Sequence, residues 1–117
     1  MEKDEAVRAL GALAHPGRLD VFRMLVQAGR DGMAAGEIAR ATGSPQSSLS
    51  ANLTILSNAG LIAPRRDGRS IIYTAHYDAM RGLLAFLMED CCAGSPEICA
   101  PLAAVVSQCC PAEGARV

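Results

Sequence analysis

The sequence predicts a mainly α-helical protein with a small β-hairpin. Half of the 117 residues are apolar, but only two Phe, two Tyr and no Trp are among them. Leu, Ile, Val, Ala and Met must therefore fill the core, and this mixture favours helices. Apolar residues recur at helical spacing along most of the chain. The spacing changes only around Asp67-Gly68, where two short apolar runs flank a strong hairpin signal.

Two amphipathic helices are expected at the N-terminal end. Residues 4–14 are expected to form the first, with an apolar face at helical spacing that consists of Ala6, Val7, Leu10, Leu13 and Ala14. Pro16 suits the first position of a second helix, and Gly29 follows its end. The apolar face of this second helix is expected to consist of Leu19, Phe22, Leu25 and Val26.

A short helix, a glycine turn and a longer helix are expected next, after a loop at residues 30–32. The third helix should cover residues 35–42. Ser44 is a favourable N-cap and Pro45 suits the first helical position, so the fourth helix should begin there and run to about Asn58. Its buried stripe is expected to be Leu49, Leu53 and Leu56.

The last long helix is expected after the hairpin. Helical spacing returns from Met80 to Cys91, behind Asp78 as a cap. Gly94 and Pro96 should end this helix and turn the chain. A short helix over residues 102–108 is the last element expected.

This order of elements is that of a winged helix-turn-helix, a DNA-binding fold. Short side chains on the fourth helix would let it enter the major groove, where they can touch base edges or donate to phosphates. Arg65, Arg66 and Arg69 flank the hairpin tip and would reach the DNA backbone or minor groove, although they also fit an ordinary solvated turn. The polar face of the fourth helix comprises Gln46, Ser47, Ser48, Ser50, Ala51 and Thr54.

The charge is distributed unevenly, although the net charge is only −1. Residues 38–77 contain four arginines and one acidic residue, Asp67, an excess of three positive charges. From Asp78 onward, five acidic residues outnumber two arginines. The first region can therefore meet phosphate, whereas the second cannot.

All five cysteines lie in the last quarter of the chain. The N-terminal ten residues have acidic side chains where a signal peptide needs basic ones, and no apolar run approaches a membrane span, so we expect a cytoplasmic protein with no membrane partner. Thiols stay reduced there, which favours ligands or redox groups over disulfides. The adjacent Cys91 and Cys92 would also make a strained bridge.

The chain resembles the ArsR/SmtB family of metal-responsive winged-helix repressors. Three stretches carry the resemblance, LAHPGRLDVFRML at 13–25, SPQSSLSANLTILSNAGLI at 44–62 and RRDGRSIIYT at 65–74. It covers roughly residues 5–90. It implies a homodimer joined through the first and last long helices, an inverted-repeat DNA operator, and repression relieved when an ion binds. The apolar stripes of those two helices exceed what one small core can cover, which independently favours a dimer.

The resemblance also implies DNA contacts at matching positions of the fourth helix, Gln46, Ser47, Ser50 and Asn52. Family members often carry a histidine near Ala51 and Asn52 and a basic residue near Thr54, and both are absent here. The operator that this helix reads should differ accordingly.

The family places its ion sites in different elements. The third-helix cysteine motif is absent from residues 32–40, and the zinc site of the last helix would need a second histidine where Leu87 stands. His76 and His15 are expected to be strand-end, capping or helix-entry residues. The remaining pattern, Cys91, Cys92 and Cys99, resembles that of the arsenic-responsive members.

Three thiolates suit a trivalent, pyramidal ion such as arsenite or antimonite, whereas zinc prefers four donors. The turn at Gly94 and Pro96 would bring Cys99 back over the adjacent pair. Cys91 alone would equally fit a small buried side chain. Cys109 and Cys110 could supply a fourth ligand or collect ions, but a loose reactive tail is favoured.

The sequence therefore predicts a DNA-binding and dimerisation domain at residues 1–90 and a cysteine-rich sensing segment at 91–117. The expected function is a repressor without a permanent cofactor, induced by As(III) or Sb(III). A thiol-redox repressor, or one responding to Cd or Pb, is the alternative. An enzyme is not expected, because the chain has no Cys-x-x-Cys and no His, Lys or Arg beside the cysteine cluster to lower a thiol pKa.

Overall fold

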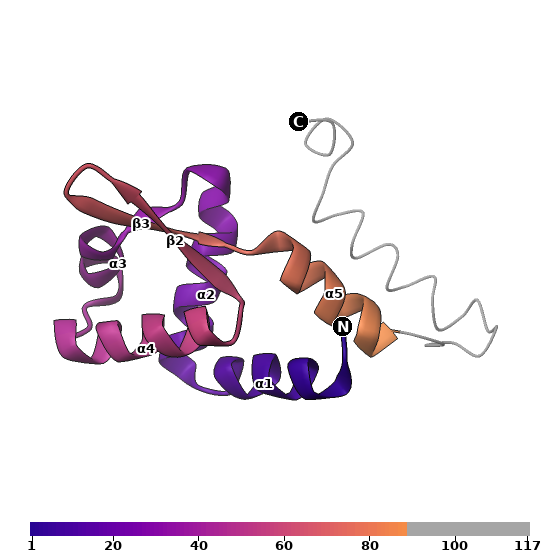
Figure 1. Cartoon of the computed structure of the whole chain (residues 1–117). Coiled ribbons are helices and arrows are strands. Elements are labelled where there is room, and N and C mark those ends of the chain that lie inside the picture. The colour runs from indigo at the N-terminus through magenta and orange to yellow at the C-terminus, as the bar shows by residue number, and fades with distance from the viewer. Residues whose placement is uncertain (89–117) are drawn as a thin grey trace. The chain divides into compact units, whose positions relative to one another are not determined.

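The computed structural model describes residues 1–88 (Figure 1). The first of the chain's two compact units comprises Met1–Phe86. No helix within the described range is long and apolar enough to cross a membrane. The elements are α1 (Lys3–Leu13), α2 (Pro16–Ala28), a 3₁₀ turn (Gly29–Asp31), β1 (Met33–Ala34), α3 (Ala35–Thr42), α4 (Gln46–Asn58), β2 (Ile62–Asp67), β3 (Ser70–Ala75) and α5 (Tyr77–Met88).

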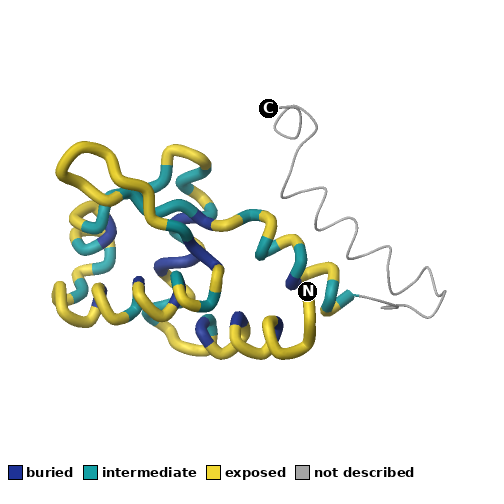
Figure 2. Tube along the Cα trace, in the orientation of Figure 1, coloured by how far each residue is buried: buried dark blue, intermediate teal, exposed yellow. Residues whose placement is uncertain are grey.

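Aliphatic side chains from every helix and from the sheet meet in one core. The dark blue segments of Figure 2 mark where these elements are buried. Ile38 of α3 and Leu25 of α2 are completely buried. The α4 stripe of Leu49, Leu53 and Leu56 is buried, which confirms the prediction. Each such leucine contributes about 1.5–3 kcal/mol by leaving water.

The first two helices bury partly different residues from those expected. In α1 the inward face is made of alanines, Ala6, Ala9 and Ala12, whereas Val7 is 61% exposed and Leu10 41% exposed. In α2 the prediction is confirmed for Phe22 and Leu25 but is wrong for Leu19, which is 42% exposed while Val21 is buried. The small alanines let α1 lie close to its neighbours and leave its larger apolar side chains at the surface.

The predicted hairpin is the larger part of a three-stranded antiparallel sheet with strand order β1-β3-β2. Its tight turn is at Gly68-Arg69, because Asp67 still pairs with Ser70. The loop expected at residues 30–32 instead contains the end of a 3₁₀ turn and leads into β1. Gly32 precedes β1 with a φ of 67°, and a Cβ there would collide with the Tyr73 carbonyl oxygen. Only glycine lets β1 approach β3 this closely.

Both histidines cap helices, as expected. The Nδ1 atom of His15 accepts from the backbone N–H groups of Gly17 (3.1 Å) and Arg18 (3.3 Å) at the start of α2. The Nδ1 atom of His76 accepts from the Ala79 N–H (3.0 Å) at the start of α5. The expected cap at Asp78 is wrong, since Asp78 lies in the first turn of α5.

The expected cap of α4 is also wrong. The helix begins one residue later than predicted, with Pro45 as its N-cap and no side-chain cap. The backbone N–H of Ser44 donates to the Thr42 hydroxyl (3.3 Å), which keeps Ser44 in the turn between α3 and α4.

We expect His15→Ala to lower the free energy of unfolding by about 0.5–2 kcal/mol, because two N–H groups lose their acceptor. His15→Asn should keep most of the stability, since its side-chain oxygen can accept the same bonds. Urea unfolding at one fixed protein concentration measures both. Equal stability of the alanine and asparagine variants would contradict the capping role.

Candidate nucleic-acid interface

The helix-turn-helix consists of α3, a short turn and α4. Gly43 ends α3 in the left-handed conformation at φ 68°, and its N–H donates to the Ala39 carbonyl (2.9 Å). The chain then reverses and enters α4. Ile38 from α3 and the leucine stripe of α4 belong to the same core, which fixes the angle at which α4 presents its other side.

The side of α4 opposite the leucine stripe is exposed and uncharged. Residues 41–64 contain no charged side chain at all. The Thr54 hydroxyl donates to the Ser50 carbonyl (2.9 Å). The methyl group of Thr54 takes no part in this bond and remains available for apolar contact. The exposed predicted residues are Gln46, Ser47, Ser48, Ser50, Ala51 and Thr54.

Asn52 is the one predicted α4 residue that is half-buried. A Cβ built at Gly17 would lie 3.3 Å from the Asn52 Nδ2 atom, so this amide packs against the start of α2. Its contact with DNA stays a prediction. The structure adds a second role, that of joining α4 to α2, which local sequence patterns do not reveal.

The wing, which is the hairpin of β2 and β3, carries the positive charge of the candidate interface. Arg65 and Arg66 on β2 and Arg69 in the turn are all exposed, and none of them forms an ion pair within the described residues. Arg69 lines a groove of about 440 Å³ together with Ser50 and Thr54 of α4. Helix α4, the candidate recognition helix, and the wing therefore border one groove, with neutral side chains on the α4 side and the Arg69 guanidinium group on the wing side.

Removal of the wing charge should weaken DNA binding without changing which sequence is preferred. We expect Arg66→Ala to reduce the slope of log affinity against log salt by about 0.9 for each phosphate that is no longer neutralised, because fewer counterions are released. Anisotropy titrations at several salt concentrations measure this slope. Arg81→Ala is the control, because Arg81 on α5 pairs with Asp78 instead (2.9 Å). An unchanged slope for Arg66→Ala would remove this arginine from the interface.

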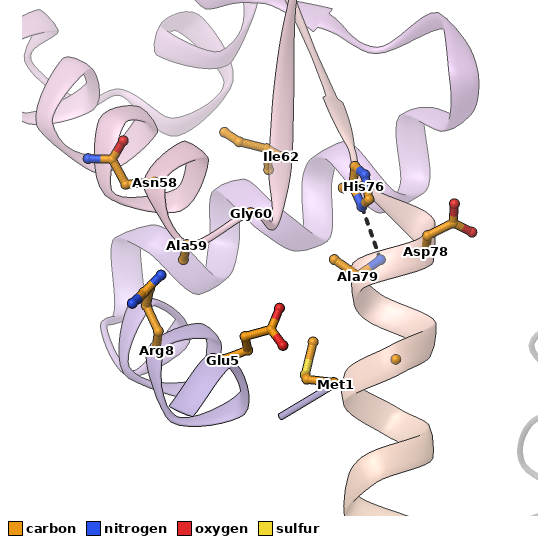
Figure 3. A pocket seen from close by; sticks show the side chains of 11 residues that line it. Met1, Glu5, Arg8, Asn58, Ala59, Gly60, Ile62, His76, Asp78 and Ala79 are labelled. Atoms are coloured by element: carbon orange, nitrogen blue, oxygen red, sulfur yellow. Dashed lines mark hydrogen bonds between the residues drawn. The ribbon is translucent and has the colours of Figure 1, made fainter. Parts of the chain in front are cut away.

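The start of α5 is hydrogen-bonded to the segment after α4 and to the end of α2. The His76 N–H donates to the Leu61 carbonyl (2.8 Å), just after α4, and the Tyr77 hydroxyl donates to the Val26 carbonyl (2.9 Å) at the end of α2. Beside these bonds, a pocket of about 530 Å³ separates α1 from the turn after α4 and from α5 (Figure 3). Glu5 and Arg8 line its α1 side, and His76 lines its α5 side.

The predicted ion ligands lie outside the described residues. These ligands are Cys91, Cys92 and Cys99. The additional thiols, Cys109 and Cys110, and the short helix expected at residues 102–108 lie outside the described residues as well. The described part of α5 ends at Met88, three residues before Cys91. Within residues 1–88, no three His, Cys, Asp or Glu side chains gather in a group that could hold a metal ion.

Comparison with known proteins gives consistent matches. A helix-turn-helix domain model matches residues 13–65. The HTH-type transcriptional regulator YgaV of Escherichia coli (strain K12) is 35% identical over 89 residues, which are 76% of this chain and 88% of YgaV. The homodimeric winged helix-turn-helix domain of Mb0332 from Mycobacterium bovis, a possible ArsR-family regulator, is 32% identical with a TM-score of 0.61, covering 73% of this chain and 77% of that one.

The chain belongs to the ArsR/SmtB-type winged helix-turn-helix transcriptional regulators. These regulators bind DNA and are not enzymes. A further similar structure is that of a possible transcriptional regulator for arsenical resistance, at 28% identity and a TM-score of 0.60, covering 68% of this chain and 79% of the other. The prediction of a winged helix-turn-helix is thereby confirmed. The structure adds the short strand β1, which the sequence did not predict.

Proposed function

We propose that this ArsR/SmtB-type regulator is a metalloid-responsive repressor. Its homodimer binds an inverted-repeat operator and leaves it when As(III) or Sb(III) binds Cys91, Cys92 and Cys99. The observation that carries the proposal is the grouping of three thiols within nine residues, directly after the helix that is fastened to the DNA-binding domain. Soft thiolates select trivalent metalloids over hard cations.

The exposed apolar residues of α1 and α5 support a dimer. Val7 and Leu10 on α1 and Leu84 on α5 are between 41% and 61% exposed. Large apolar side chains that are exposed on two helices are typical of a surface that another protein covers. A second copy of the chain is the proposed occupant, since the similar Mb0332 domain is homodimeric. A two-fold dimer would then place two recognition helices on an inverted repeat.

The two bonds at the start of α5 supply a route from the ion to DNA. An ion-induced shift of α5 would pull on the Leu61 carbonyl just after α4 through His76, and on α2 through Tyr77. The pocket beside α1 leaves space for such a shift. A change in the separation of the recognition helices would lower operator affinity by about 5- to 150-fold, the usual range of coupling between two sites.

The test is fluorescence anisotropy of the reduced, full-length protein on DNA from its own promoter. The complex is titrated in parallel with arsenite, antimonite, cadmium, lead, zinc and peroxide. Release by the two trivalent metalloids is the expected result. Release by peroxide alone would replace the proposal with a redox repressor, and release by cadmium or lead alone with a soft-metal repressor.

A further inference from the structure

Helix α4, the proposed recognition helix, carries no charged side chain. No charged residue occurs between Arg40 and Arg65, so α4 offers neither an Arg or Lys for guanine nor an Asp or Glu for cytosine. Those pairings are the usual direct readout of G·C base pairs in the major groove. What this helix can offer is the carboxamides of Gln46, the half-buried Asn52 and Asn58, together with several hydroxyl groups and several methyl groups.

These groups occupy particular positions on the helix. Ser47, Ala51 and Thr54 share one face at i, i+4 and i+7, opposite the buried leucine stripe. Gln46 is the first residue of α4 and is exposed, in the N-terminal part of the helix that commonly meets base edges. Ile55 adds a further apolar side chain beside this face and is 40% exposed.

The Thr54 side chain is oriented by a hydrogen bond to the backbone of the preceding turn of α4. Because its hydroxyl donates to the Ser50 carbonyl, the hydroxyl proton is not available to a base. The hydroxyl oxygen can then only accept a hydrogen bond, and the methyl group is the part left for apolar contact. Ala51 ends in a methyl group as well. A glutamine carboxamide matches adenine in a bidentate pair, and apolar groups match the thymine 5-methyl.

We propose that α4 reads A·T base pairs, with Gln46 pairing to adenine and with Ala51 and Thr54 contacting thymine methyl groups. The wing arginines add affinity but little sequence information, since they meet phosphates or the minor groove. This inference rests on the proposed function, because it requires α4 to enter the major groove. It goes further by naming the composition of the half-site.

The experiment begins with selection of bound duplexes from a randomised library by the reduced, full-length protein. The selected half-site is expected to be rich in A·T pairs. In the best duplex, each contacted thymine is then replaced by uracil, which removes only the 5-methyl group. Each such replacement should weaken binding about fourfold, the value of one methyl group removed from water.

Two matched variants identify the protein side of the contact. Thr54→Ser removes the methyl group and keeps the hydroxyl that bonds Ser50, so the thymine-to-uracil difference at its base pair should vanish. Thr54→Val keeps a methyl group in place and should retain the difference.

Gln46→Ala tests the contact with adenine. It should weaken binding about 5- to 150-fold on the adenine-containing duplex and less than about twofold after that base pair is changed to G·C.

The outcomes separate the two proposals. A selected half-site dominated by G·C pairs, or equal binding of thymine and uracil duplexes at every position, overturns the A·T readout while leaving a DNA-binding regulator. No binding to any duplex overturns the proposed function itself.

Discussion

Serine in place of Cys91, Cys92 or Cys99 is expected to leave operator binding intact and to abolish release by arsenite. Serine is nearly isosteric with cysteine, but its hydroxyl stays protonated and is a hard donor that arsenic does not prefer. The affinity ratio between apo and arsenite-treated protein should therefore fall from about 5- to 150-fold to about one. Anisotropy on the promoter duplex measures this ratio for each variant.

Cys109→Ser and Cys110→Ser are the matched controls. They change the same chemical group farther along the chain, at two residues that the proposed ligand set does not include. Release should remain unchanged in both. If the Cys91, Cys92 and Cys99 variants still leave DNA when arsenite is added, the site is elsewhere; if the control variants lose the response, the ligand set has to include them.

A glutamate at Leu10 or Leu84 is expected to convert the protein to a monomer and to weaken operator binding by about 10²- to 10⁴-fold. A buried carboxylate at a two-fold interface meets its own copy or an apolar surface, and either is costly. Loss of the dimer removes the gain from binding two half-sites together. Analytical ultracentrifugation gives the oligomeric state, and anisotropy gives the affinity.

Leu19→Glu is the control for this effect. Leu19 is 42% exposed, almost the same as Leu10 at 41%, but it lies on α2 rather than on a proposed dimer helix. A general effect of surface charge would appear in both variants. Dimeric Leu10→Glu protein, or a Leu19→Glu variant that becomes monomeric, would place the interface elsewhere.

The sequence predicted most elements because proline and glycine mark their ends. Pro16 and Gly29 bound α2, and α3 and the end of α4 lie where they were expected. Strand β1 could not be predicted, because two residues are too few to show an alternating pattern. The face of α1 was misjudged because alanine is weakly apolar, and packing geometry rather than hydrophobicity selected Ala6, Ala9 and Ala12 for burial.

The candidate site likewise has features that local sequence patterns predict and features that depend on packing between elements. The exposed polar face of α4 follows from helical spacing alone, since it is the side opposite the leucine stripe. The bond from Tyr77 to Val26 joins residues 51 apart in sequence, and the packing of Asn52 against Gly17 joins two helices. Contacts of this kind depend on how the elements pack, and no local pattern reports them.

Reciprocal coupling between arsenite and DNA tests the central claim most directly. If arsenite lowers operator affinity through one conformational equilibrium, the operator must lower arsenite affinity by the same factor. Calorimetric titration of arsenite into the reduced dimer, with and without a saturating promoter duplex, measures both affinities. We expect arsenite to bind about 5- to 150-fold more weakly on DNA. Equal affinities in the two titrations would show that metalloid binding and DNA release are not linked.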